Sequence, residues 1–218
     1  MFLIAHRANN NHNFSENSMN AIVSCVECDY IDGIEIDVRI TKDKQLVLIH
    51  DPIIDFSSNG HGIVKYMNLT ELARHEYGKS REQLTLLEDV FKIIGNKILL
   101  VELKISGNDY IDIVDETVRL FNRYSSVNLY ICSFNFGLLI YLKNNYRSIR
   151  CGLIIGYGLN KFKYINNFDF LVLSSKNLDL LNRKKYNFIF GIKENQLGTN
   201  LKNIYLITDK SYKFLNKK

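Results

Sequence analysis

The chain has 218 residues, enough for one domain with a sizeable core or for two small ones. Hydrophobic residues make up 46% of it and charged residues 23%, as in ordinary soluble globular proteins, and no apolar stretch approaches the length of a membrane helix. The single proline, Pro52, and the lack of Gly/Ser-rich stretches leave no linker signal, so we predict one domain over residues 1–218.

The net charge of +5 is unevenly distributed. From Asp179 onward the chain has nine Lys and Arg residues against three Asp and Glu residues, a local charge of +6. We interpret this region as a solvated basic surface, with a nucleic-acid or anionic-membrane patch as the alternative, and we expect no nucleic-acid partner. The first residues, Met1–His6, lack a basic segment and are too short an apolar run for a signal peptide, which favours a cytoplasmic location.

Apolar runs and helix-like segments alternate along the chain. The runs predicted as strands are Phe2–His6, Gly33–Ile40, Leu46–His50, Ile98–Ile105, Asn128–Phe134, Arg150–Tyr157, Phe168–Ser174, Asn187–Ile192 and Ile204–Thr208. The segments predicted as helices are Ser18–Cys28, Leu86–Ile94, Tyr110–Tyr124 (capped by Asn108 or Asp109), Phe136–Asn144 and Leu178–Lys184. This alternation predicts parallel βαβ units, and about eight of them in one domain favour a compact TIM (β/α)8 barrel over an open sheet.

Two segments depart from a regular barrel. Leu46–His50 follows Gly33–Ile40 after the polar turn Thr41–Lys44, which indicates an extra strand or a hairpin extension rather than a full βα unit. Glu194–Asn203, between the last two predicted strands, is short for a crossover helix, so we predict a trimmed last crossover.

Two carboxylates share one face of a predicted strand. Glu35 and Asp37 are two residues apart in an otherwise apolar run, so their side chains point the same way. Buried together, they would repel each other unless a positive charge lay between them, and a divalent cation with oxygen ligands, Ca²⁺ or Mg²⁺, meets that need. The alternative is an edge strand with one solvated face.

Glu102 and Lys104 repeat this spacing on a later strand. An acid and a base on one face can form a buried ion pair. Beside the first pair of carboxylates, the interpretation as a third metal ligand and a phosphate-binding ammonium is favoured.

Two histidines end apolar runs. His6 and His50 should therefore reach the same mouth of a barrel, and each is followed by a polar residue, Arg7 or Asp51. A lone histidine in such a place is more often structural, but two of them favour acid/base chemistry.

Several short motifs run along the chain. They are His6-Arg7-Ala8 with Ser15-Glu16-Asn17, Glu35-Ile-Asp37 followed by His50-Asp51-Pro52, then Leu84–Val90, Val101–Lys104, Ser133-Phe134 and Ile207–Asp209. Together they resemble the motifs of the glycerophosphodiester phosphodiesterase family over nearly the whole chain. Asn59–Gly62 and Asn68–Leu72 resemble the insertion that follows the HD motif in this family, so residues 51–84 are predicted to form a small cap-like insertion.

The resemblance implies a TIM barrel with its site at the C-terminal face of the strands, one divalent cation, Mg²⁺ or Ca²⁺, as cofactor, and a small-molecule glycerophosphodiester as substrate. It implies attack by the substrate's own glycerol hydroxyl to give a cyclic phosphate, which water then opens to leave glycerol phosphate. Carried over residue by residue, the roles are general acid/base for His6 and His50, metal ligands for Glu35, Asp37 and Glu102, and phosphate contacts for Arg7 and Lys104.

Three positions depart from the family pattern. Ala8 replaces the glycine of the family's HRG motif, Ser15 replaces the proline of its PEN motif, and Phe190 stands where a tryptophan is usual on the seventh strand. None of these changes removes a chemical group that the reaction needs.

Two alternatives stay open. One is phospholipase-D-like or lyase activity on lysophospholipids, and the other is a barrel that binds an anion or a membrane surface without turnover. The intact histidines and carboxylates argue against the second. The apolar residues of the predicted insertion are too scattered for an acyl-chain groove, so we expect a small deacylated diester such as glycerophosphocholine to be preferred, with at most weak contact to a membrane surface.

Overall fold

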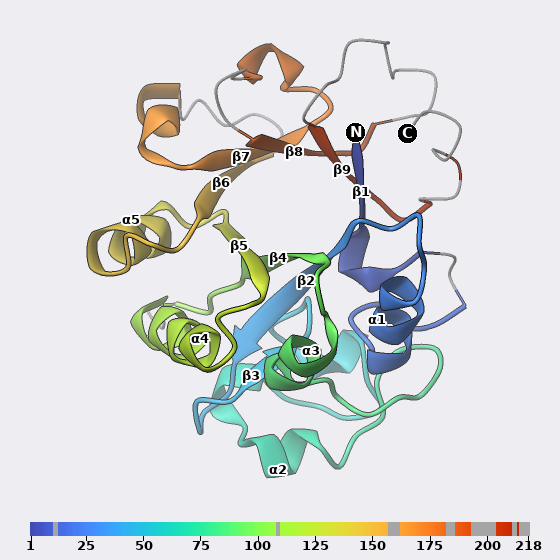
Figure 1. The fold of residues 1–218 in the computed structure, drawn as a ribbon. Helices are drawn as coiled ribbons and strands as arrows, with labels where there is room; N and C mark the ends of the chain where they lie inside the picture. Colours follow the sequence, from blue (N-terminus) through green and yellow to red (C-terminus); the bar gives the residue numbers. More distant parts are fainter. Residues whose placement is uncertain are drawn as a thin grey trace.

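Eight parallel strands form a closed barrel in the described part of the chain (Figure 1). This computed structural model describes residues 1–10, 13–107, 110–156, 162–181, 186–192, 204–210 and 213. The barrel strands are β1 (Phe2–Ala5), β2 (Gly33–Ile40), β4 (Ile98–Leu103), β5 (Asn128–Ser133), β6 (Cys151–Ile155), β7 (Phe170–Ser174), β8 (Tyr186–Phe190) and β9 (Ile204–Thr208). β1 pairs in parallel with both β9 and β2, which closes the sheet and confirms the predicted TIM barrel.

A ninth strand extends β2 on its far side. β3 (Leu46–Leu48) runs antiparallel to β2, with Leu48 opposite Val38. The hydroxyl of Thr41 accepts the backbone N–H of Gln45 at 2.9 Å and closes the connecting turn. The prediction of a hairpin extension is confirmed, although His50 lies beyond the end of the strand.

The longer helices lie outside the ring of strands (Figure 1). They are α1 (Met19–Val26), α3 (Leu87–Ile93), α4 (Tyr110–Arg123) and α5 (Phe136–Asn145). Side-chain caps begin two of them, because Ser18 accepts the N–H of Ala21 and Asn135 accepts the N–H of Leu138. The caps predicted for α4, Asn108 and Asp109, lie outside the described residues.

The connections on either side of β7 contain short 3₁₀ turns. They are η4 (Phe162–Asn167) and η5 (Leu178–Leu180). The prediction of an α-helix over Leu178–Lys184 is wrong in its described part, because Leu181 leaves helical geometry with a ψ of 105°. Leu178 and Leu181 pack on the apolar cluster of β1, β8 and β9, and one turn suffices for that contact. The predicted trimming over Glu194–Asn203 lies outside the described residues.

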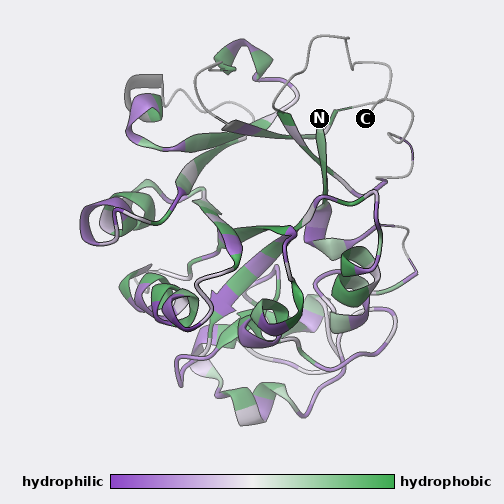
Figure 2. Ribbon diagram, viewed as in Figure 1, coloured by the Kyte–Doolittle hydropathy of each residue, from purple (hydrophilic) through white to green (hydrophobic). Residues whose placement is uncertain are grey.

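The barrel interior is apolar toward the N-terminal ends of the strands and charged toward their C-terminal ends. Tyr130, Phe170 and Phe188 meet inside it with ring centroids 5.2 to 5.5 Å apart. Gly152 of β6 makes room for them, since a Cβ there would lie 2.3 Å from the Phe170 ring. Figure 2 shows alternating hydrophilic and hydrophobic bands along β2, which brings Glu35 and Asp37 into the interior.

Residues 51–84 follow β3 and contain three short helical segments. These are η2 (Ile54–Phe56), η3 (Val64–Tyr66) and α2 (Leu69–Leu72). Their apolar side chains share a small core of their own with β3 and the residue after it, formed by Val47, Ile49, Ile54, Val64, Leu72 and Tyr77. A separate core gives this segment a fixed shape beside the barrel. Its function as a cap within a single domain stays a prediction.

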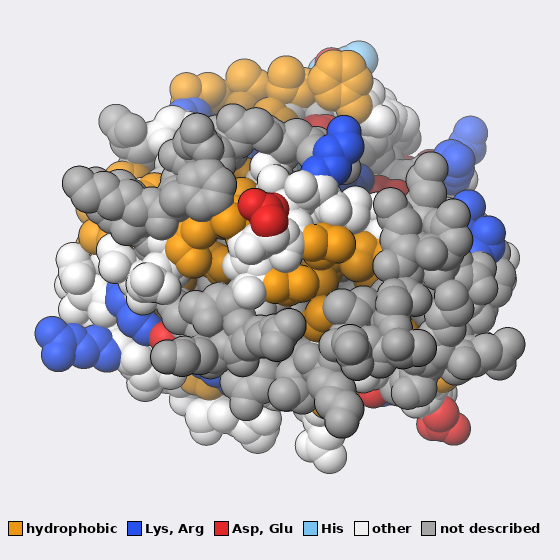
Figure 3. All heavy atoms as spheres, turned by 90° about the horizontal axis from the view of Figure 1, so that it is seen from above, with side chains coloured by type: hydrophobic (Ala, Val, Ile, Leu, Met, Phe, Trp, Pro, Cys, Tyr) orange, Lys and Arg blue, Asp and Glu red, His pale blue; other side chains and the backbone are white. Residues whose placement is uncertain are grey.

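Two observations concern the surface. None of the described helices is long and apolar enough to cross a membrane. On the face shown in Figure 3, the Lys and Arg side chains that are described lie apart from one another. Much of the basic region from Asp179 onward lies outside the described residues, so its interpretation as a solvated surface stays a prediction.

We predict that Gly152→Ala lowers the free energy of unfolding by about 1–3 kcal/mol, because the added methyl group is forced against the Phe170 ring. Urea unfolding measures the loss. The double variant Gly152→Ala, Phe170→Leu should lose less than the sum of the two single changes, because the smaller side chain vacates the space. An unchanged unfolding midpoint for Gly152→Ala would contradict this packing.

Candidate active site

Three carboxylates meet inside the C-terminal end of the barrel. Glu35 and Asp37 project inward from β2, and the strand register places Asp37 beside Glu102 of β4. One oxygen from each lies within 4.8 Å of the others, a spacing that can hold a metal ion. Glu35 and Asp37 are buried, and β2 lies between β1 and β4, so the alternative of an edge strand with a solvated face is excluded.

Two permanent cations face these carboxylates. The Lys104 ammonium lies 2.6 Å from Glu102 Oε1 and 3.2 Å from Asp37 Oδ1. Arg7 Nε lies 3.3 Å from Asp37 Oδ2, and the Arg7 backbone N–H donates to Glu35 Oε2 at 2.9 Å. When all three carboxyl groups are ionised, they exceed these two cations by one negative charge, which suits a bound cation.

The pKa values of the two carboxyl groups on β2 are shifted in opposite directions. Burial and the neighbouring charge of Asp37 raise the pKa of Glu35 to about 8. Burial acts in the same direction on Asp37, but Lys104 and Arg7 outweigh it and hold the pKa of Asp37 below its usual range. Asp37 is therefore ionised at neutral pH, whereas Glu35 must lose a proton to act as an ionic ligand.

A tight turn after β1 places Arg7. Within η1 (His6–Ala8), Arg7 has a φ of 50° and Ala8 a φ of 55°, both in the left-handed region. The glycine of the family motif adopts this conformation freely, while Ala8 holds it at a cost of about 1–2 kcal/mol. The turn aims both the backbone N–H and the guanidinium of Arg7 at the carboxylates, so the departure at Ala8 keeps the geometry.

His6 is oriented by the last strand of the barrel. Its Nδ1 lies 2.7 Å from Oδ1 of Asp209, which follows β9, and its Nε2 lies 3.9 Å from Glu35 Oε2. An ionised carboxylate can only accept, so Asp209 places a proton on Nδ1 and leaves Nε2 toward the cluster. Burial opposes protonation of the ring, but Asp209 and Glu35 outweigh it and raise the pKa of His6 to about 9.

His50 has a similar partner on the other side of the mouth. Its Nδ1 lies 2.8 Å from Asp51 Oδ1. The buried guanidinium of Arg39 donates to the His50 carbonyl from Nε at 3.0 Å and from Nη2 at 2.7 Å, and it also reaches the Ser106 hydroxyl at 3.1 Å. Arg39 thus ties the segment after β3 to the loop after β4 and fixes the backbone of His50.

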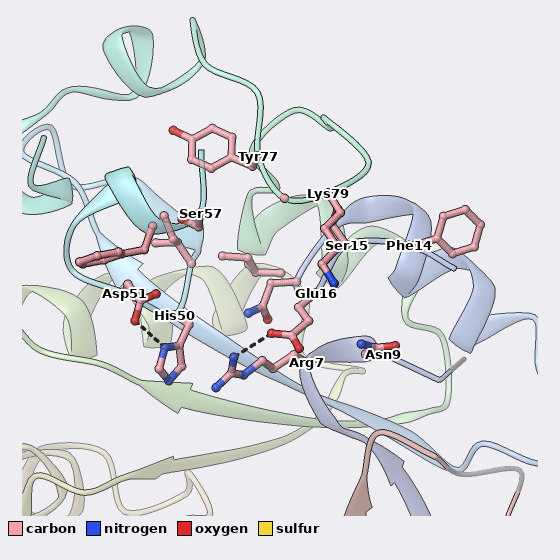
Figure 4. A pocket seen from close by; sticks show the side chains of 15 residues that line it. Arg7, Asn9, Phe14, Ser15, Glu16, His50, Asp51, Ser57, Tyr77 and Lys79 are labelled. Carbon is pink, nitrogen blue, oxygen red and sulfur yellow. Dashed lines mark hydrogen bonds and ion pairs between the residues drawn. The ribbon is translucent and has the colours of Figure 1, made fainter. Parts of the chain in front are cut away.

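A cavity of about 370 Å³ opens beside these groups, between the loop after β1 and the segment 51–84 (Figure 4). Arg7 and His50 line one end of it, and Tyr77 and Lys79 line the other. The Arg7 guanidinium is paired with Glu16 at 2.7 Å, at the edge of this space. The cavity therefore leads from the ionisable groups of the barrel mouth toward solvent.

Asn17 belongs to the site, although its motif alone predicted no role for it. Its Nδ2 donates to Asp37 Oδ2 at 3.0 Å, and its Oδ1 accepts the Asp37 backbone N–H at 3.1 Å. Asn17, Asp209 and Arg39 were all missed as site residues. Asn17 and Asp209 belong to two of the family-like motifs, Ser15-Glu16-Asn17 and Ile207–Asp209, which could have pointed to them. Arg39 could have been found because it continues the inward i,i+2 series of Glu35 and Asp37.

The fold and the site define a class of protein: a TIM-barrel enzyme with its ionisable groups at the C-terminal ends of the strands. The family model described as the Glycerophosphoryl diester phosphodiesterase family matches residues 6–187, so the chain belongs to this family.

Individual relatives agree with this assignment. A glycerophosphodiester phosphodiesterase of Caldanaerobacter subterraneus subsp. tengcongensis is 33% identical over 166 residues, which cover 72% of this chain and 68% of the relative. The YhdW protein of Bacillus subtilis is 35% identical over 162 residues, 71% of this chain and 65% of that protein. The matches thus span about two thirds of these relatives' lengths.

Solved structures give the same fold. An Oleispira antarctica phosphodiesterase, crystallised in complex with the product sn-glycerol-3-phosphate, superposes with a TM-score of 0.85 at 19% identity, over 99% of this chain and 96% of that chain. The predicted family and its class of enzyme, the phosphodiesterases, are confirmed.

We predict that Asn17→Gly lowers the free energy of unfolding by about 1–3 kcal/mol, because it removes two hydrogen bonds to the buried Asp37. Glycine keeps the backbone conformation, since Asn17 has a φ of 58°. Lys44→Gly is the matched control, an exposed site with a φ of 61°, and should be nearly neutral or stabilising. Equal unfolding midpoints for the two variants in urea would argue against the role of Asn17.

Proposed function

We propose that this protein hydrolyses glycerophosphodiesters to glycerol phosphate and an alcohol, with a divalent cation and two histidines. One observation carries the proposal: His6 and His50, each with Nδ1 on an aspartate, stand beside a carboxylate cluster faced by Arg7 and Lys104. These are the groups that cleavage of a phosphodiester needs, namely proton carriers for the attacking hydroxyl and for the leaving oxygen, and positive charge for the phosphoryl oxygens.

The proposed roles of the histidines follow from their partners. Because Nδ1 of each ring is engaged by Asp209 or Asp51, Nε2 is the nitrogen available to substrate. One histidine takes the proton of the substrate's glycerol hydroxyl, which attacks phosphorus, and the other gives a proton to the leaving alcohol. Water then opens the cyclic phosphate with the two roles reversed.

The proposed cation ligands are Glu35, Asp37 and Glu102. An all-oxygen set of this kind suits Mg²⁺ or Ca²⁺ and not a thiolate-seeking metal. When bound, such an ion supplies Lewis-acid stabilisation of charge on the phosphoryl group. With the ion bound and Glu35 deprotonated, the cluster counted with Lys104 and Arg7 would carry one excess positive charge, which matches the single negative charge of a phosphodiester.

The proposed phosphate contacts are Arg7 and Lys104. Both cations are partly shielded from solvent and rest on carboxylates, so their positions are fixed before substrate arrives. A guanidinium in such a place can present two parallel N–H groups to a phosphate, while the ammonium acts as a point charge.

We predict that His6→Ala and His50→Ala each lower kcat by a factor on the order of 10²–10⁴ on glycerophosphocholine, because each removes a positioned proton carrier. The proposed activity itself is tested by measuring the glycerol phosphate that wild-type protein forms from glycerophosphocholine. His61→Ala is the control, since that ring is 88% exposed and pairs only with Asp55 among the described residues, and it should leave kcat unchanged. Near-normal turnover by either of the first two variants would remove that histidine from the mechanism.

We also predict that EDTA abolishes turnover and that Mg²⁺ or Ca²⁺ restores it. Because the pKa of Glu35 is raised to about 8, its carboxyl is protonated at pH 7, and binding should release about one proton per ion. The apparent affinity should therefore rise as pH increases toward 8 and then level off. Calorimetry in two buffers of different ionisation enthalpy measures the release, and Glu35→Gln should abolish it. Full turnover after removal of all divalent ions would contradict the proposal.

A further inference from the structure

The cavity between the barrel mouth and the segment 51–84 is built from only part of the site. Arg7 and His50 line it, whereas none of the three carboxylates Glu35, Asp37 and Glu102 does. A separate cavity of about 330 Å³ adjoins Glu102 and Lys104 on the β4 side. A phosphodiester has two alcohol arms. Because Arg7 lines the cavity of about 370 Å³ under the segment 51–84, a phosphate on Arg7 would place one arm at that cavity.

Lys79 brings an uncompensated positive charge to this cavity. Its exposed side chain has neither an ion pair nor a hydrogen bond among the described residues, and Figure 4 shows it extending from the segment 51–84 toward Glu16 at the mouth. The other charged groups of the lining are engaged, because Arg7 is paired with Glu16 and Asp51 with His50. The Ser57 hydroxyl, also in the lining, is buried without a hydrogen-bond partner.

The turn that carries Lys79 is fixed on both sides. The Gly78 N–H donates to the Ser57 carbonyl at 2.7 Å, and the Ser80 N–H donates to the Ser15 hydroxyl at 2.9 Å. Gly78 has a φ of 67°, and a Cβ there would lie 2.3 Å from the Ser15 hydroxyl oxygen, so the backbone approaches closely. The hydrogen bonds on either side of Lys79 therefore fix the backbone that places its side chain at the cavity.

The hydrogen bond from the Ser80 N–H requires a side-chain acceptor at position 15, which Ser15 supplies. It stands where the PEN motif has proline, and proline offers no side-chain acceptor for the Ser80 N–H. Ser15, which departs from the family pattern, thus supplies one of the two backbone attachments that hold the Lys79 turn at the mouth.

We propose that Lys79 forms a subsite for the alcohol arm and selects arms that carry a carboxylate, such as a phosphoserine-type headgroup. An unpaired ammonium can bind a carboxylate, and it repels the quaternary ammonium of choline. This inference rests on the proposed phosphodiesterase function and adds the chemistry of the leaving group to it.

The test compares two substrates that differ only in the carboxylate, glycerophosphoserine and glycerophosphoethanolamine. Wild-type protein should cleave the serine diester with a kcat/KM about fivefold or more above that of the ethanolamine diester, the effect of one charge-assisted contact. Lys79→Gln should bring this ratio close to one, and Lys79→Glu should invert it. Ser15→Ala should reduce the ratio by releasing the turn. Arg74→Gln, which removes an equal charge from the same segment outside the cavity lining, should leave it unchanged.

Binding without turnover separates this inference from the proposed function. In the His6→Ala background, calorimetry should give the same Lys79-dependent preference in Kd. Equal kcat/KM values for the two diesters in wild type, a ratio that survives Lys79→Gln, or an equal loss with Arg74→Gln would overturn the subsite while leaving the phosphodiesterase intact. Lys79-dependent binding without any turnover by wild type would instead overturn the proposed function.

Discussion

The site depends on keeping Asp37 ionised inside the barrel. A buried carboxylate loses its hydration, and it stays charged only if the protein replaces that hydration with opposite charge and hydrogen bonds. Here Lys104, Arg7 and Asn17 supply the replacement from three different parts of the chain. Contact with the Asp37 carboxylate in turn fixes the position of each of these side chains. One buried charge thereby organises the loop after β1, the motif before α1 and the end of β4.

The barrel architecture makes this concentration of charge tolerable. Parallel register places Asp37 beside Glu102 without any loop between them, and the apolar layer of Tyr130, Phe170 and Phe188 closes the barrel beneath. The same geometry explains why the pKa of Glu35 rises: its carboxyl group is buried and lies next to the negative charge of Asp37.

Sequence patterns predicted the features that repeat locally. The i,i+2 spacing of Glu35 and Asp37 was enough to place both inside the barrel, and the polar turn before β3 was enough to predict a hairpin. Contacts between distant segments left no comparable local pattern. The pairing of His6 with Asp209 spans 203 residues and depends on barrel closure. The helix predicted from Leu178 is wrong for a different reason. There the local composition favoured a helix, but the tertiary contacts of Leu178 and Leu181 outweighed it.

The pairing of His6 with Asp209 has a consequence for synthesis. β1 and the first histidine leave the ribosome early, but both the closing strand β9 and the aspartate that orients this histidine come about 200 residues later. At roughly 5–20 residues per second, an emerging chain holds an open, unpaired edge on β1 for roughly 10–40 s. During that interval the residues of the candidate active site lie on a sheet that is not yet closed into a barrel. The orientation of His6 and the closure of the barrel therefore both depend on the segment that contains β9 and Asp209.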